Sequence, residues 1–466
     1  MSLAIIDTEL LTFEGSSVGA IKNGAVGIEE NELVFVGKSR ELNEKDYEEI
    51  IDGSNHITMP GLVDAHIHTG LSLLRGAAQD VPEKEWMNQA LGPIARHMDE
   101  EDKIASSRLT VLEALRCGTT TFAEFSEGVK ELIDDVYLPY SVRVAAAETI
   151  NEVAGSRNEL YELESSKEKL QENEQLFEDY EEVSLVEPLY GPQALDMVTS
   201  ETLKEIKRRA ESENRKIHMH VAQGGREREQ IRDKYDTSTV KKLDEMGLLG
   251  ENLIAAHCHG ASQEEMELMA DKGVKMVGCP SSIGMIDGVV PPVKSFLDHG
   301  GKAALGSDQT PGSGAHNIFR EMRTISLLSK CENKDPTALP AWKALKLGTK
   351  GGSEVLGLDE KIGTLEEGKR ADVITLDLKK LNMTPTVYEP FRNFIPNLVY
   401  STTGLEVDNV IIDGKRVLRE GEFTDIDEES VIEEAEERAK KLYQRAGEDW
   451  REANSQMVQY RKEGNI

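Results

Sequence analysis

The middle of the chain alternates short apolar segments with longer helical patterns, and this alternation restricts the possible folds more than any other feature. Eight apolar segments have the pattern of strands, and helical patterns such as 200–213 and 263–272 fall between most of them. Eight strands that alternate with helices over about 250 residues are what a (β/α)8 barrel requires. The expected strands are 61–66, 119–122, 142–147, 183–189, 217–221, 253–257, 274–278 and 303–306.

Both ends of the chain have the pattern of β-structure. Residues 3–7, 25–29 and 33–36 are expected to be strands, with Asn23-Gly24 as a hairpin turn. Residues 371–377 and 407–413 are also strand-like, and Asp413-Gly414 is a second turn signal. We therefore predict an α/β fold: a (β/α)8 TIM-type barrel with a small discontinuous β-sandwich domain built from both chain ends. The predicted divisions are 1–58 and 362–424 for the β-sandwich, 59–361 for the barrel, and 425–466 for a charged helical extension packed on the outside.

Charge and composition disfavour several kinds of partner. The chain carries 86 Asp+Glu against 54 Lys+Arg, a formal net charge of −32, which disfavours binding to nucleic acid or to anionic membranes. No segment approaches the roughly 20 apolar residues of a membrane-spanning helix. The start of the chain, with Asp7 and Glu9, lacks the pattern of a signal peptide. Four widely spaced cysteines form no CxxC pair, as in a cytoplasmic protein with reduced thiols. Adaptation to high salt is a further hypothesis for the acidity, and solubility in low and molar salt would test it.

Histidines gather where the expected strands end. The chain has ten, and six fall in three short segments. Residues 60–68 read PGLVDAHIH, so His66 and His68 project from one face of a strand. IHMH at 217–220 and AAHCH at 255–259 end two further strands, and LGSD at 305–308 ends the last one with a carboxylate. Because barrel enzymes collect their reacting groups at the C-terminal ends of strands, these segments predict a divalent-metal site there.

With these motifs the sequence resembles the amidohydrolase superfamily, in particular its cytosine-deaminase-like branch. That branch includes methylthioadenosine/adenosylhomocysteine deaminases and triazine chloro- and aminohydrolases. The resemblance runs nearly from end to end, as far as IGTLEEGKRAD at 362–372, and PGLVDAHIH, AAHCH and LGSD together carry it. Superfamily relatives often form dimers or tetramers, so the resemblance also implies a homo-oligomer.

The resemblance implies a set of site residues. His66, His68, His220 and Asp308 would hold one divalent metal ion, with Zn favoured and Fe or Mn as alternatives. His257 would stabilise the developing tetrahedral centre, and Asp308 would take the proton from metal-activated water. Binuclear members use a lysine at the end of strand four. Residues 186–192 contain none, which favours a single metal ion.

Two positions depart from the deaminases of this branch. The acid that usually follows the strand-five ligand by three residues is Gln223 here, and the usual Gly-Pro-His after strand four ends in Gln193. A neutral amide can bind and orient a substrate, but it cannot shuttle protons as a carboxylate does. We therefore expect Gln223 at a catalytic position. Either Glu227, Glu229 or Asp308 supplies the missing acid, or the leaving group needs less protonation.

Substrate contacts are expected from four residues around the barrel mouth. Trp86 lies on the first long loop, where the family supplies an aromatic wall, although plain packing is the alternative role for this side chain. The other three follow strands four, seven and eight: they are Gln193, Ser281 and Gln309. The remaining histidines are expected to be structural. His218 and His259 are predicted to point away from the site by alternation, and His56, His97, His299 and His316 to lie at the surface or at helix caps.

We therefore expect a cytoplasmic, metal-dependent hydrolase that deaminates a small amino-substituted heterocycle of the purine, pyrimidine, pterin or triazine type. Its partners would be that small molecule and water. A chlorohydrolase or cyclic-amide hydrolase that uses the same site is an alternative, which Gln223 keeps open. A barrel without catalysis that serves as an assembly partner is a second alternative. It is disfavoured because such a protein has no need for this group of polar residues at its strand ends.

Overall fold

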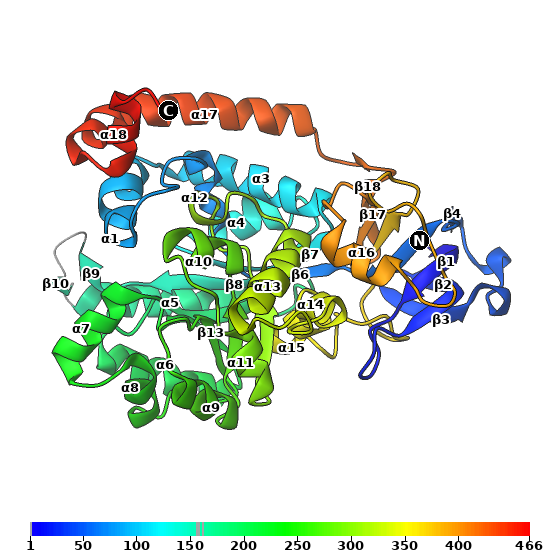
Figure 1. Cartoon of the computed structure of the whole chain (residues 1–466), viewed down its shortest axis with the longest axis horizontal. Coiled ribbons are helices and arrows are strands. Elements are labelled where there is room, and N and C mark those ends of the chain that lie inside the picture. Colours follow the sequence, from blue (N-terminus) through cyan, green and yellow to red (C-terminus); the bar gives the residue numbers. More distant parts are fainter. Residues whose placement is uncertain (1, 155–158, 161–162) are drawn as a thin grey trace.

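The computed structural model describes residues 2–154, 159–160 and 163–466, and its centre is an eight-stranded parallel sheet (Figure 1). The strands are neighbours in chain order, as in a (β/α)8 barrel. They are β6 (Leu62–Ile67), β7 (Thr119–Ser126), β8 (Arg143–Ile150), β11 (Val186–Pro192), β12 (Ile217–Val221), β13 (Leu253–His257), β14 (Lys275–Gly278) and β15 (Lys302–Leu305). Each corresponds to one predicted strand, with ends that differ by a few residues, so the predicted barrel is confirmed.

Backbone contacts of Asp308 close the barrel between its last and first strands. The Asp308 N–H donates to the His66 carbonyl at 3.0 Å, and the His68 N–H donates to the Asp308 carbonyl at 2.8 Å. A Cβ atom at Gly306 would lie 2.7 Å from the His66 carbonyl oxygen, so only glycine permits this approach. Barrel closure therefore places Asp308 directly beside His66 and His68.

Helices follow the barrel strands and surround the sheet, and those from residue 310 onward come after the last barrel strand. Several begin at side-chain caps; for example, Ser262 and Glu265 form a capping box at the start of α9 (Gln263–Asp271). Other long helices are α3 (Glu100–Arg116), α5 (Leu163–Asp179), α6 (Ser200–Glu213), α7 (Gly225–Tyr235) and α13 (Ile318–Asn333). Shorter ones are α1 (Glu83–Glu85), α2 (Gly92–Ala95), α4 (Val129–Leu132), α8 (Thr239–Glu245), α10 (Pro280–Ile286), α11 (Val293–Asp298), α12 (Thr310–Ser313), α14 (Ala341–Leu347), α15 (Lys350–Leu356) and α16 (Phe394–Tyr400).

Segments from both chain ends form a second, mostly antiparallel sheet of nine strands beside the barrel (Figure 1). β5 from the first end pairs antiparallel with β16 from the other, which joins the two halves as predicted. The predicted domain boundaries themselves remain a prediction. The strands are β1 (Ser2–Leu11), β2 (Ala20–Glu29), β3 (Glu32–Lys38), β4 (Glu49–Asp52), β5 (His56–Pro60), β16 (Val373–Asp377), β17 (Val407–Ile412), β18 (Lys415–Arg419) and β19 (Glu422–Phe423).

One of the two predicted hairpin turns was wrong. Asn23-Gly24 lies inside β2, where the register with β1 shifts, and the chain turns earlier, where the Thr12 N–H donates to the Gly19 carbonyl at 3.1 Å. Asn23 has φ 49°, a conformation that a bulge uses as readily as a turn, so the dipeptide alone does not distinguish them. Asp413-Gly414 is confirmed as a turn, because Ile412 pairs with Lys415 across it.

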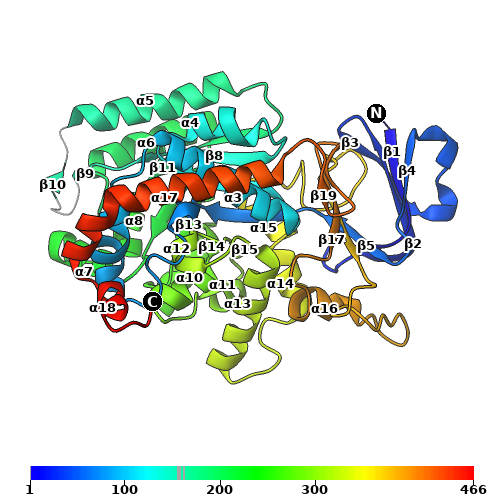
Figure 2. The ribbon, with the colours of Figure 1, turned by 90° about the horizontal axis from the view of Figure 1, so that it is seen from above.

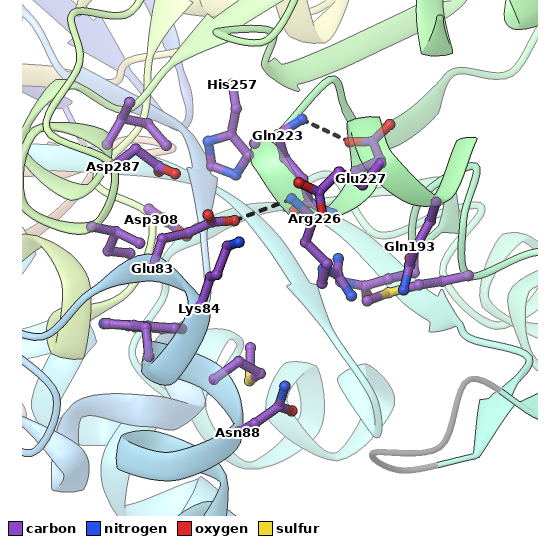
Figure 3. Close-up of a pocket in the computed structure, with 18 of the residues that line it drawn as sticks. Glu83, Lys84, Asn88, Gln193, Gln223, Arg226, Glu227, His257, Asp287 and Asp308 are labelled. Atoms are coloured by element: carbon purple, nitrogen blue, oxygen red, sulfur yellow. Dashed lines mark hydrogen bonds between the residues drawn. The ribbon is translucent and has the colours of Figure 1, made fainter. Parts of the chain in front are cut away.

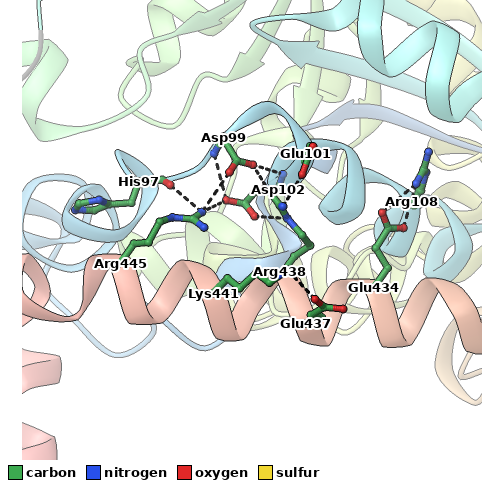
Figure 4. Close-up of polar contacts among 10 residues, drawn as sticks. All are labelled: His97, Asp99, Glu101, Asp102, Arg108, Glu434, Glu437, Arg438, Lys441 and Arg445. Carbon is green, nitrogen blue, oxygen red and sulfur yellow. Dashed lines mark hydrogen bonds and ion pairs between the residues drawn. The ribbon is translucent and has the colours of Figure 1, made fainter.

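The C-terminal extension lies along the outside of the barrel (Figure 2). α17 (Glu428–Ala453) packs on α3 and α2, and α18 (Gln456–Lys462) follows it. Arg438 of α17 donates to Asp102 at 2.8 Å and to Glu101 at 2.6 Å, and Arg445 also binds Asp102, whose side chain is fully buried (Figure 4). An ion-pair network therefore fixes α17 to the start of α3. Among the described residues, no helix is long and apolar enough to cross a membrane.

Candidate active site

Five polar side chains from four strand ends meet at the C-terminal mouth of the barrel. Ligand atoms of His66, His68 and Asp308 lie within 4.8 Å of one another, and so do those of His66, His220 and His257. His66 is in β6 and His68 directly follows it, β12 and β13 supply one histidine each, and Asp308 follows β15. The residues expected to bind a metal ion and His257 are thus brought together, with His66 common to both groups.

Backbone carbonyls determine which nitrogen two of these imidazoles offer. His68 Nδ1 donates to the Phe125 carbonyl at 2.6 Å, and His220 Nδ1 donates to the Gln193 carbonyl at 2.9 Å. With Nδ1 protonated, Nε2 carries the lone pair that a metal ion needs. Nε2 of His68 lies 3.5 Å from Asp308 Oδ1. This is the arrangement of oriented imidazoles that divalent-metal sites use.

The chemistry of the cluster fits a divalent cation. Nε2 of His66 is buried without a hydrogen-bond partner and lies 3.8 Å from Asp308 Oδ1. A buried polar atom without a partner is costly unless a ligand completes it. Burial lowers the pKa of His66, His220 and His257 well below the usual value, which keeps these imidazoles in the neutral form that binds metal ions.

The Asp308 carboxylate is oriented by the loop after β14. The Ser282 hydroxyl, in the first turn of α10, donates to Asp308 Oδ2. Asp308 has φ 60° and His257 has φ 75°, conformations that non-glycine residues rarely adopt and that are frequent at functional sites. Burial raises the pKa of Asp308, and the nearby His68 opposes that shift. Sequence spacing could not indicate which of the two serines after Cys279 would contact Asp308.

Three histidine predictions were wrong. His259, expected to point away from the site, lies with Nε2 3.5 Å from Asp287, a residue of the cavity above the cluster. His218 is buried inside the barrel, with Nε2 3.0 Å from His66 Nδ1, because residues two apart on a strand share a face. A hydrogen bond between the two rings holds the His66 imidazole in place. His316 is also fully buried, and its ring lies between the hydroxyls of Ser307 at 2.7 Å and Thr310 at 2.9 Å. That contact depends on the path of the loop after β15.

A cavity of about 450 Å³ opens above the cluster (Figure 3). A second cavity of about 470 Å³ shares several of its lining residues. Gln193, Gln223 and Gln309 line both cavities together with His257 and Asp308. Gln193 and Gln309, which were predicted to contact the substrate, and Gln223, which was predicted at a catalytic position, therefore all face the space above the candidate metal site. Trp86 lines the first cavity, and its buried Nε1 has no hydrogen-bond partner.

Ser281 does not line either cavity. Its N–H donates to Glu321 of α13 at 2.9 Å, and its hydroxyl lies 3.5 Å from that of Thr324. The helical turn at α10 directs this residue toward α13 and its neighbour Ser282 toward Asp308, so the expected substrate contact at Ser281 is corrected. Five charged residues that the sequence did not single out line the first cavity: Asp233 and, labelled in Figure 3, Glu83, Lys84, Arg226 and Asp287.

The protein is a TIM barrel. Its candidate active site, beneath an open cavity, has the histidines and the carboxylate that bind divalent metal ions in such barrels. Comparison with known families gives a match to the amidohydrolase family over residues 57–417. The chain belongs to this family, as the motifs predicted, and is a hydrolase.

Similar proteins include several deaminases. A 5'-deoxyadenosine deaminase from Methanothermobacter thermautotrophicus is 31% identical over 94% of this chain and all of the relative. A 5-methylthioadenosine/S-adenosylhomocysteine deaminase from Thermoanaerobacter pseudethanolicus is 32% identical over 96% of this chain and all of the relative. A zinc-bound adenosine deaminase structure from Xanthomonas campestris is 25% identical, with a TM-score of 0.87 over 95% of this chain and 98% of that one. The zinc complex of atrazine chlorohydrolase from Arthrobacter aurescens (20% identity, TM-score 0.84, 94% and 100% coverage) has the same fold.

Proposed function

We propose that the protein is a zinc-dependent deaminase of an amino-substituted heterocycle, with adenine nucleosides as the first class to test. The observation that carries this proposal is the meeting of His66, His68, His220, His257 and Asp308 beneath a cavity lined by three glutamines. The deaminase relatives, which are named for adenosine derivatives, support the substrate class. In the reaction, water adds its oxygen to the ring carbon and the amino group leaves as ammonia.

Three histidines and one carboxylate would hold the metal ion. They are His66, His68, His220 and Asp308, a donor set that suits zinc. Two similar structures contain zinc. When bound, the cation supplies Lewis acidity, which lowers the pKa of a water molecule toward neutrality.

Protein side chains supply the remaining chemistry. Asp308 accepts a proton from the attacking water, and Ser282 holds its second oxygen in place. His257 lies at the cavity floor and stabilises charge that develops on the reacting carbon's substituents. Gln223, whose buried Nε2 has no partner, offers a hydrogen bond to a ring nitrogen. Trp86 provides an apolar wall on which a flat heterocycle packs.

One observation supports a second candidate function. Gln223 cannot transfer a proton to a departing amine, whereas chloride leaves without one. Hydrolysis of a carbon–chlorine bond in the same site is therefore the alternative activity, and a cyclic-amide hydrolysis is less favoured. The family resemblance alone supports a homo-oligomer, and the four widely spaced cysteines support a cytoplasmic location.

Ammonia release from a panel of amino-purines, pyrimidines, pterins and triazines tests the proposal. Protein of assayed metal content should release ammonia from at least one class, lose this activity on chelation and regain it with zinc. Chloride release from chlorinated analogues should be measured in parallel. Metal-replete protein that releases chloride but no ammonia would replace the proposal with the alternative.

A further inference from the structure

Three polar groups from three loops converge beside Gly224, the residue that follows Gln223. A Cβ atom at Gly224 would lie 3.2 Å from Glu83 Oε1, 3.3 Å from Asp287 Oδ1 and 3.6 Å from His259 Nε2. Glu83 is in α1 after β6, His259 follows β13, and Asp287 ends α10 after β14. Because glycine has no side chain, the point between these groups is left open. We call Glu83, Asp287 and His259 around this point the Gly224 cradle.

The two carboxylates of the cradle lack a cationic partner from lysine or arginine. Among the residues that the structure describes, Asp287 pairs only with His259, at 3.5 Å, and Glu83 forms no ion pair. Arg226 gives Glu83 only a backbone N–H, at 3.4 Å, because its guanidinium pairs with Asp196 at 3.2 Å (Figure 3). Two carboxylates thus face one small space, and neither forms an ion pair with a lysine or an arginine in the described part of the chain.

His259 is the second sign of a missing ligand. Its side chain is only 5% exposed, yet neither ring nitrogen makes a hydrogen bond. Buried imidazole nitrogens are nearly always paired. A group that donates several hydrogen bonds and carries positive charge would satisfy both carboxylates and the imidazole lone pair together, since charge-assisted bonds of this kind are the strong ones.

The cradle opens into the active-site cavity. Glu83, Gly224 and Asp287 line the same cavity as His257 and Asp308. The His257 and His259 rings are 6.4 Å apart between centroids. A molecule whose reacting carbon lies over the metal ligands can therefore extend toward the cradle without leaving the cavity.

We propose that the Gly224 cradle binds an ammonium-type cation, either a protonated primary amine carried by the substrate or free ammonium. The substrate source rests on the proposed function, whereas binding of the cation itself does not. A neutral donor at this position would form only ordinary hydrogen bonds with Glu83 and Asp287, and an anionic group would be repelled by them. The cradle would thus select substrates that carry a second, protonated amine, or retain the ammonium that the reaction releases.

Two nucleosides that differ only by a primary amine test whether the cradle binds an amine carried by the substrate. Binding of 5'-amino-5'-deoxyadenosine and 5'-deoxyadenosine should be measured by calorimetry on zinc-loaded and zinc-free protein, at neutral pH and low salt. The amine should bind at least about tenfold more tightly to the wild type. This preference should fall toward one in Glu83→Gln and in Asp287→Asn. Asp233→Asn removes a carboxylate from the same cavity wall, outside the cradle, and should keep the preference.

Ammonium chloride tests whether the cradle binds free ammonium. It should raise the melting temperature of the wild type above that in tetramethylammonium chloride of equal concentration, and this difference should vanish in the two cradle variants. Because Glu83 and Asp287 lie on different elements, a folding defect in one variant leaves the other informative. Equal affinity for both nucleosides together with no ammonium effect would overturn the proposal. Both experiments measure binding and not catalysis. A protein that binds the amine but releases no ammonia would therefore contradict the proposed function and leave the cradle proposal intact.

Discussion

The Glu227 carboxylate accepts the backbone N–H of Gln223 at 2.7 Å and that of Ala222 at 3.2 Å. It also accepts the hydroxyl of Thr239 at 2.7 Å and is fully buried. Glu227 therefore holds the turn that carries Gln223, and its oxygens are already engaged. Of the acids considered as replacements for the missing glutamate, Asp308 is the one that belongs to the metal-type cluster.

Gln223→Glu should raise kcat/KM for ammonia release by about tenfold or more, because a carboxylate at this position can transfer protons to the ring and the leaving group. Rates on the best amino-heterocycle of the panel would be compared at equal metal content. Gln230→Glu adds the same charge to the cavity wall and should bring no such gain. No change, or a loss, in Gln223→Glu would mean that Gln223 serves a different leaving group.

Asp308→Asn should reduce turnover by at least about 1000-fold, because it removes the carboxylate proposed both to bind the metal ion and to accept the proton. Circular dichroism should stay that of the wild type, since the backbone contacts that close the barrel do not involve the carboxylate. The exposed Asp298→Asn is the matched control and should retain full activity. A near-normal rate in Asp308→Asn would refute the proton role.

Chelation should abolish activity and lower the melting temperature, because the buried imidazoles of the cluster lose the ligand that satisfies them. A ligand at 100 times its Kd stabilises a fold by about 2.7 kcal/mol. Calorimetric melting before chelation, after it, and after zinc is restored measures both effects. His68→Ala should bind less zinc than the wild type, whereas His299→Ala, at an exposed position, should bind the same amount.

Glu321 should make stability fall as the pH rises. Burial raises the pKa of this carboxyl from 4.5 to about 8, and its Oε1 has no partner. The folded state therefore retains a proton that the unfolded chain releases near pH 4.5, so stability present below that pH is lost progressively up to about pH 8. Urea unfolding from pH 5 to 9 should show a weaker decline in Glu321→Gln than in the wild type. Glu332→Gln, exposed on the same helix, should follow the wild type; equal slopes in all three would contradict the prediction.

Arg438→Ala should lower the free energy of unfolding by about 2–4 kcal/mol, because it leaves the buried Asp102 carboxylate short of one of its two arginines. Lys440 of the same helix forms an exposed pair with Glu436 at 3.7 Å, and Lys440→Ala should cost less than about 0.5 kcal/mol. Urea unfolding of the three proteins makes the comparison. If both variants lose the same free energy of unfolding, the ion pairs in Figure 4 contribute no more than an ordinary exposed ion pair.

The sequence predicted the barrel because each of its strands is a short apolar run bounded by turn residues. It predicted the metal-type cluster because the two-residue spacing of His66 and His68 and the position of Asp308 follow directly from strand geometry. The prediction for His218 was wrong because it placed His218 and His220 on opposite faces of the strand, whereas residues two apart share a face.

Contacts that depend on the path of loops could not be predicted. Ser281 and Ser282 are chemically identical neighbours, and only the helical turn at α10 decides which one reaches Asp308. Glu83 lies in a loop whose short α1 is followed by π-helical residues Trp86–Leu91, a conformation without a periodic signal. His316 is buried through its contacts with Ser307 and Thr310 of the loop after β15, which no local pattern records.

The loop that carries Glu83 and Trp86 is held by the far end of the chain. The Gln456 N–H donates to Glu85 at 3.0 Å, and the Tyr460 hydroxyl donates to the Asp80 carbonyl at 3.3 Å. During synthesis these residues leave the ribosome after every barrel strand has emerged. A nascent chain can thus assemble the histidine cluster at its strand ends before these contacts brace the cavity wall, and the pocket is complete only when translation has passed α18.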